Sequence, residues 1–143
     1  MQKIRVSIYE DNPQLAETLT WIIGSAADMV LTGWHPDAEA VSQEVAEEVP
    51  DVILMDIEMP GISGIEAVRK VAASSPLMPR ILMFTVFEDA DKIFEALKAG
   101  AVGYLLKNTT AEKITESIRE VHGGGAAMSP SIAAKVLNFF KEP

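Results

Sequence analysis

The fold of this chain is decided by the stretch Asp51-Val-Ile-Leu-Met-Asp56, which runs directly into Ile57-Glu-Met-Pro-Gly61. The short apolar run is typical of a strand that is buried on both faces, and the Pro-Gly pair predicts a turn after it. Asp56 is therefore expected at the carboxyl end of a strand. In an open parallel sheet, ligands bind at that end of the strands.

A second pair of acids follows another strand pattern. The segment Lys3-Ile-Arg-Val-Ser-Ile-Tyr9 is followed at once by Glu10-Asp11. If both strands are central and parallel, the carboxylates of Glu10, Asp11 and Asp56 converge on one point. Crowded carboxylates repel one another, so such a cluster is typical of a cation site. Its all-oxygen ligands suit a hard ion such as Mg²⁺.

The rest of the chain alternates apolar strand patterns with amphipathic helix patterns. We expect strands over 4–9, 29–34, 52–55, 80–85 and 102–106, each followed by a helix. The helices are predicted to begin at Asn12-Pro13, Pro36-Asp37, Ser63-Gly64, Asp89 and Thr110. This alternation predicts an α/β fold with a doubly wound, flavodoxin-like five-stranded parallel sheet in the order 2-1-3-4-5. That order makes the first and third strands neighbours.

Composition limits the classes of function. The 143 residues fit one domain, and the apolar fraction of 48% with a charged fraction of 23% is that of a soluble globular protein. We find no apolar run long enough for a membrane span and no signal-peptide pattern. The absence of cysteine fits a cytoplasmic protein. The net charge of −9 argues against direct binding of nucleic acid by this chain.

The character of the sequence changes after residue 122. Gly123-Gly-Gly125 predicts a hinge, and a helix is expected from Ser129-Pro130 with apolar residues at helical spacing as far as Phe139-Phe140. We therefore divide the chain into a domain over 1–122 and a hinge with a linker or dimerisation helix over 123–143. The apolar face of that helix predicts either a dimer or domain contact, or packing back on its own domain.

Four motifs lie in order at successive strand ends and resemble one family. They are Tyr9-Glu-Asp11, Met55-Asp-Ile-Glu-Met-Pro-Gly61, Met83-Phe-Thr85 and Gly103-Tyr-Leu-Leu-Lys107. The pattern over 3–122 resembles the receiver (CheY-like) domain of two-component response regulators, and the tail from Gly123 resembles the NarL/FixJ-type subfamily. In that subfamily a DNA-binding helix-turn-helix domain normally follows. This chain carries none, so we expect DNA contact only through an attached output domain.

The resemblance implies a role for each matched residue. Asp56 would accept a phosphoryl group from a phosphohistidine on a sensor histidine kinase. The Mg²⁺ ligands would be Asp11, Asp56, the backbone carbonyl of Glu58 and, through a water, Glu10. Lys107 and the Thr85 hydroxyl would bind the phosphoryl oxygens.

The resemblance also implies a switch. Tyr104 would swing from solvent into the space that Thr85 vacates, which would change the face made by the fourth helix, fifth strand and fifth helix and so control homodimerisation. Val86 stands where a smaller residue is usual, and we expect it to narrow access to Asp56. We interpret His35, His122, Trp21 and Trp34 as structural residues.

Two other functions remain open from the residues. A stand-alone receiver would act only through protein contacts. An aspartate-nucleophile phosphatase of the haloacid dehalogenase type also uses a strand-end acid pair, which Asp56-Ile-Glu58 superficially fits. That family places its nucleophile on the first strand, whereas Asp56 follows the third. A flavodoxin is rejected, because the acidic loop Glu10-Asp-Asn-Pro13 cannot bind a phosphate.

Overall fold

A computed structural model describes residues 2–141. Its centre is one parallel sheet of six strands in the order β2-β1-β3-β4-β5-β6. Each central strand is almost wholly buried, as its continuous apolar sequence predicts. The strands are β1 (Ile4–Tyr9), β2 (Met29–His35), β3 (Val52–Met55), β4 (Arg80–Thr85), β5 (Gly103–Leu106) and β6 (Ala127–Met128).

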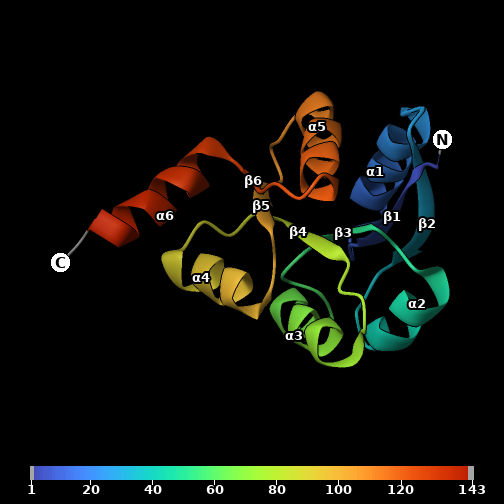
Figure 1. Ribbon diagram of the computed structural model, residues 1–143, viewed down its shortest axis with the longest axis horizontal. Helices are drawn as coiled ribbons and strands as arrows, with labels where there is room; N and C mark the ends of the chain where they lie inside the picture. Colours follow the sequence, from blue (N-terminus) through green and yellow to red (C-terminus); the bar gives the residue numbers. More distant parts are fainter. Residues whose placement is uncertain (1, 142–143) are drawn as a thin grey trace.

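Helices cover both faces of the sheet (Figure 1). They are α1 (Pro13–Ser25), α2 (Val41–Glu48), α3 (Gly64–Ser74), α4 (Ala90–Ala99), α5 (Ala111–His122) and α6 (Pro130–Lys141). One buried cluster joins the sheet to α2, α3, α4 and the start of α6, and the other joins it to α1 and α5. Tyr9 belongs to the first cluster and Ile8 to the second, as the alternation of side chains along a strand requires.

Side-chain caps fix where four of the helices begin. The Asn12 side chain accepts hydrogen bonds from the backbone N–H groups of Gln14 and Leu15 at the start of α1. Ser63, Asp89 and Thr110 cap the next helices in the same way. The helix α2 begins at Val41, without a side-chain cap, and not at Pro36-Asp37 as the sequence analysis expected. The intervening segment forms turns, in which the backbone N–H of Glu39 bonds to Asp37.

The sheet has six strands, so the prediction of five was one strand short. Ala127 and Met128 pair with Gly103 and Tyr104 on the outer side of β5. The Ser129 hydroxyl extends this contact by accepting a hydrogen bond from the backbone N–H of Leu106. A strand of two residues has no readable alternation, which is why the pattern of the sequence did not reveal it.

The last helix leaves the body of the domain along its length (Figure 1). Ile132 in its first turn is fully buried in the core. Further along, the ring of Phe139 lies 4.2 Å from that of Phe94 on α4, while Phe140 remains 75% exposed. Among residues 2–141, no helix is long and apolar enough to cross a membrane.

Candidate functional site

Two neighbouring strands bring the acidic residues together at the carboxyl edge of the sheet. Tyr9 at the end of β1 is opposite Met55 at the end of β3, and the backbone N–H of Asp56 donates to the carbonyl of Tyr9. Carboxylate oxygens of Glu10, Asp11 and Asp56 lie within 4.8 Å of one another. The convergence that the sequence predicted is therefore present in the structure.

Lys107 completes this cluster from the end of β5. Its ammonium group donates to Asp56 Oδ2 at 2.7 Å and to Glu10 Oε2 at 3.2 Å, and it lies 3.0 Å from Glu10 Oε1. The backbone N–H of Lys107 bonds to the carbonyl of Thr85, so the two strand ends are tied together beside the acids. The other oxygen of Asp56 accepts the backbone N–H of Ile57 at 2.7 Å.

Burial and pairing act on the ionisation of this cluster. Burial raises the pKa of Glu10 above its ordinary value, and the nearby Asp56 raises it further, although bonds from Asn12 and Lys107 oppose the shift. For Lys107, burial alone would lower the pKa. The hydrogen bonds to Asp56 and Glu10 outweigh it, so the pKa of Lys107 lies above its ordinary value. The lysine therefore stays charged and neutralises part of the acidic cluster.

The acidic cluster fits a hard divalent cation. Glu10 Oε1 is buried and forms no hydrogen bond within the described chain, although the Lys107 ammonium is near it. Asp11 is exposed at the mouth of the cluster, so its carboxylate is open to a ligand. An all-oxygen set of carboxylates is the donor set that Mg²⁺ prefers. The side chain of Glu58 points to solvent, which leaves its backbone carbonyl as the group available to an ion.

The remaining predicted residues surround Asp56 on the β4 side. Thr85 is fully buried, and its hydroxyl accepts a long, 3.5 Å hydrogen bond from the backbone N–H of Phe87. Tyr104 is also fully buried and donates its hydroxyl to the Phe87 carbonyl at 2.9 Å. Burial, with the nearby Asp89 and Asp56 carboxylates, raises the pKa of the Tyr104 hydroxyl, so it remains a donor. Val86 is 64% exposed.

Two residues to which the sequence analysis gave no role in the site, Gly64 and Trp34, contact it, and His35 lies nearby. A Cβ at Gly64 would lie 1.8 Å from the carbonyl oxygen of Asp56, so the start of α3 approaches the site too closely for any side chain. The Trp34 indole N–H donates to the carbonyl of Glu10 at 2.8 Å. His35, interpreted as structural, lies 2.9 Å from Glu44 and 2.7 Å from Glu48 and stacks on Tyr9.

Comparison with known proteins agrees with this geometry. Residues 6–119 match the response regulator receiver domain. The chain is 37% identical over 136 residues to the uncharacterized transcriptional regulatory protein YxjL of Bacillus subtilis, with 95% of this chain and 62% of the relative covered. It is 33% identical over 138 residues to the oxygen regulatory protein NreC of Staphylococcus aureus, with 96% and 63% covered.

Solved structures give the same result. A two-component response regulator of the LuxR family from Aurantimonas sp. SI85-9A1 superposes with a TM-score of 0.91 at 28% identity, over 99% of this chain and 100% of that one. The signal receiver domain of the putative response regulator NarL from Mycobacterium tuberculosis gives 0.82 at 27% identity, over 87% and 99%. The chain belongs to the response regulator receiver domain family, as its motifs predicted. It spans a little under two thirds of the curated relatives named above.

Proposed function

We propose that this chain is the phosphoacceptor module of a two-component response regulator, and that Asp56 is the residue that is phosphorylated. The observation that carries the proposal is the convergence of three carboxylates and one lysine at the end of β3. Asp56 is 3% exposed, yet it lies at the edge where parallel sheets bind ligands. A structural ion pair with Lys107 would not need the third carboxylate, that of Asp11.

The proposed step is phosphoryl transfer from a phosphohistidine of a sensor histidine kinase. An ionised oxygen of Asp56 attacks phosphorus, a P–O bond forms, the P–N bond breaks, and the departing imidazole nitrogen takes up a proton. Lys107, already 2.7 Å from Asp56, would move to the phosphoryl oxygens and stabilise their charge. The Thr85 hydroxyl would donate to the same group, because its oxygen only accepts a long bond from Phe87 and that bond does not use its proton.

Residues of the acidic cluster would hold Mg²⁺ during this step. Asp11, Asp56 and the backbone carbonyl of Glu58 would be direct ligands, and Glu10 would act through a water. A bound Mg²⁺ would neutralise charge between the anionic donor and the carboxylates. Glu10 and Asp11 therefore prepare the site for an anion that the bare cluster would repel.

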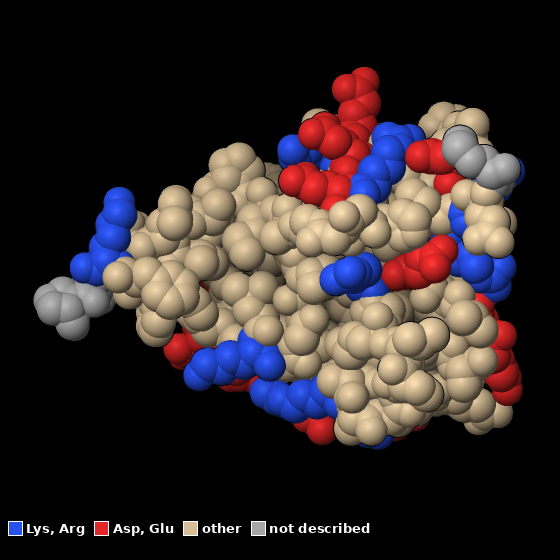
Figure 2. Space-filling model, viewed as in Figure 1, with Lys and Arg blue, Asp and Glu red and all other residues tan. Residues whose placement is uncertain are grey.

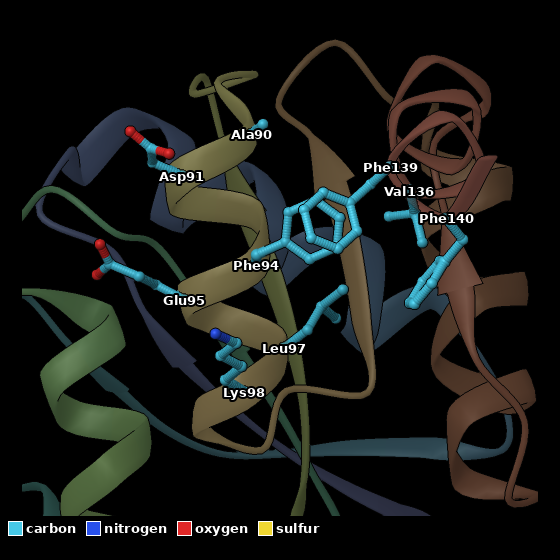
Figure 3. Close-up of a pocket in the computed structure, with 9 residues that line it drawn as sticks. All are labelled: Ala90, Asp91, Phe94, Glu95, Leu97, Lys98, Val136, Phe139 and Phe140. Atoms are coloured by element: carbon cyan, nitrogen blue, oxygen red, sulfur yellow. The ribbon is translucent and has the colours of Figure 1, made fainter. Parts of the chain in front are cut away.

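We further propose that phosphorylation controls homodimerisation through the α4-β5-α5 face and the adjacent helix α6. Tyr104 is already buried and bonded to the loop before α4, rather than in solvent as the sequence analysis expected for the starting state, so the proposed switch would act by holding it in this position. A groove of about 670 Å³ is lined by α4 and α6, which touch through Phe94 and Phe139, and Figure 3 shows Leu97, Val136 and Phe140 beside that contact. The surface over α6 is largely uncharged in Figure 2, which favours a contact with protein.

The wider role is proposed from the relatives. Several of them are transcriptional regulatory proteins, so we propose that DNA is bound by an output domain attached to this module, in the cytoplasm. The alternative of a stand-alone receiver has the same chemistry and differs only in its output. A small-molecule phosphatase is disfavoured, since Asp56 follows the third strand of a receiver fold.

The test is phosphorylation by a small donor. The protein is incubated with acetyl phosphate with and without Mg²⁺, and its intact mass is measured beside that of Asp56→Asn. We expect the mass to rise by one phosphoryl group only when Mg²⁺ is present and Asp56 is intact. A gain that persists in Asp56→Asn would overturn the assignment of the acceptor.

A further inference from the structure

An irregularity in the pairing of β1 with β2 determines which side chains reach the acidic site. Val6 pairs with Leu31, but Ser7 pairs with Gly33, so Thr32 is an extra residue in β2. The Thr32 hydroxyl bonds to the Ser7 hydroxyl at 2.8 Å and to the Val6 carbonyl, which holds the bulge in place. Bulges next to functional sites commonly serve to redirect side chains.

The bulge determines the face on which Trp34 lies. Beyond it, Trp34 pairs with Ile8 and His35 pairs with Tyr9. Without the extra residue, Trp34 would pair with Tyr9, on the opposite face of the sheet, because a shift of one residue exchanges the two faces. In the observed register, Trp34 is on the face of α1, next to the loop that carries the acids.

From that position Trp34 holds the acidic loop. Its indole N–H donates to the carbonyl of Glu10 at 2.8 Å, while the N–H of Glu10 donates to the carbonyl of His35 at 3.0 Å. The Glu10 carbonyl belongs to the same planar peptide as the N–H of Asp11, so fixing one orients the other. The Asp11 side chain is exposed, so the orientation of its backbone decides toward which side of the site its Cβ points.

We propose that Trp34 is a positioning residue for the cation site: its indole N–H orients the Glu10–Asp11 peptide and so the two carboxylates that receive Mg²⁺. Trp34 touches neither the ion nor the phosphoryl group. The inference rests on the proposed Mg²⁺ site. It adds a residue outside the four receiver motifs and explains why a tryptophan that is 41% exposed is placed at the end of β2.

The first test compares Mg²⁺ affinity in Trp34→Phe and in the parent by isothermal titration calorimetry. The substitution keeps an aromatic ring and removes only the donor. One neutral hydrogen bond corresponds to a weakening of about three- to tenfold. Trp21→Phe is the matched control, because Trp21 lies on α1 and is 73% exposed, and its affinity should equal that of the parent.

The second test measures amide hydrogen exchange without Mg²⁺. Exchange at Asp11 and Asn12 should be faster in Trp34→Phe than in the parent, while exchange in the centre of β3 should be unchanged. Equal Mg²⁺ affinity in Trp34→Phe and parent would overturn the positioning role and leave the proposed function intact. A parent that binds no Mg²⁺ would overturn both. Faster exchange throughout the sheet would also overturn it, since that result indicates general destabilisation.

Discussion

The ammonium of Lys107 lies 2.7 Å from Asp56 Oδ2 and 3.0 Å from Glu10 Oε1, so one lysine from β5 links carboxylates that follow β3 and β1. The two acids are nearly inaccessible, and the lysine side chain is 21% exposed. In the protein without metal, this lysine supplies the positive charge that the acids need. A divalent cation bound to the acids would compete with it for the same oxygens.

Substitution of Lys107 by methionine should therefore make stability depend on metal. Without Mg²⁺, Lys107→Met leaves two buried carboxylates unpaired, and we expect the free energy of unfolding to fall by about 2 kcal/mol. Mg²⁺ should recover most of that loss, because binding to the folded state alone stabilises it. Urea unfolding with and without Mg²⁺ measures the loss of stability and its recovery.

The control is Lys113→Met, which removes an exposed pair with Glu116 and should change stability by less than about 0.5 kcal/mol. Equal losses of stability in Lys107→Met and Lys113→Met would contradict the prediction.

Gly64 is required by the close approach of α3 to the site. The added methyl group of Gly64→Ala would overlap the Asp56 carbonyl, and we expect a loss of about 2–4 kcal/mol with slower phosphorylation. Gly24→Ala is the control, because nothing lies within 4 Å of its added Cβ at the end of α1. That substitution should stabilise the protein by about 0.5–1 kcal/mol. Thermal unfolding measures the stability of both variants relative to the parent. If Gly64→Ala is as stable as the parent, the steric argument is wrong.

Val86 is expected to limit access to the acceptor. It follows Thr85 directly and is 64% exposed, so its side chain is free to shield the approach without contributing to the core. Val86→Ala should speed both the gain of phosphate from acetyl phosphate and its later loss, with unfolding free energy nearly unchanged. Intact mass followed over time measures both rates. If Val86→Ala gains and loses phosphate at the rates of the parent, Val86 does not limit access to Asp56.

Tyr104 should transmit the state of Asp56 to the dimer. The conservative Tyr104→Phe removes only the bond to Phe87 and should weaken phosphorylation-dependent dimerisation, while Tyr104→Ala should abolish it. Sedimentation of each variant with and without acetyl phosphate measures how strongly dimerisation depends on phosphorylation. Both variants must still gain phosphate by intact mass. If phosphorylated Tyr104→Ala dimerises as well as the parent, the aromatic switch is wrong.

The sequence predicted the strands and the acidic site because both depend on local patterns. Each acid directly follows an apolar run, and parallel strands end at the same edge, so Glu10 and Asp56 had to meet. The sixth strand escaped prediction because Ala127–Met128 is too short to show a period. The contacts of Trp34 and His35 were not predicted, because one extra residue in β2, Thr32, determines on which face of the sheet each side chain lies. A register shift is fixed by pairing with another strand, which no local pattern records.

Glu10→Gln should change stability and metal binding in opposite directions. Burial is the largest cause that raises the pKa of Glu10, so its ionised form is unfavourable in the folded protein without metal. The folded parent then binds more protons than the unfolded chain between the ordinary glutamate pKa and the raised one, and its stability falls as pH increases through that window.

The neutral amide of Glu10→Gln has no such dependence. At neutral pH and without Mg²⁺ we expect Glu10→Gln to have the higher Tm, with the difference shrinking as pH falls from the raised pKa of Glu10 to the ordinary glutamate pKa. Its Mg²⁺ affinity should be lower, about tenfold, because one negative charge next to the ion is lost. Thermal unfolding across pH and calorimetric titration measure the two effects, and a variant that is less stable than the parent at neutral pH would show that pairing with Lys107 outweighs burial.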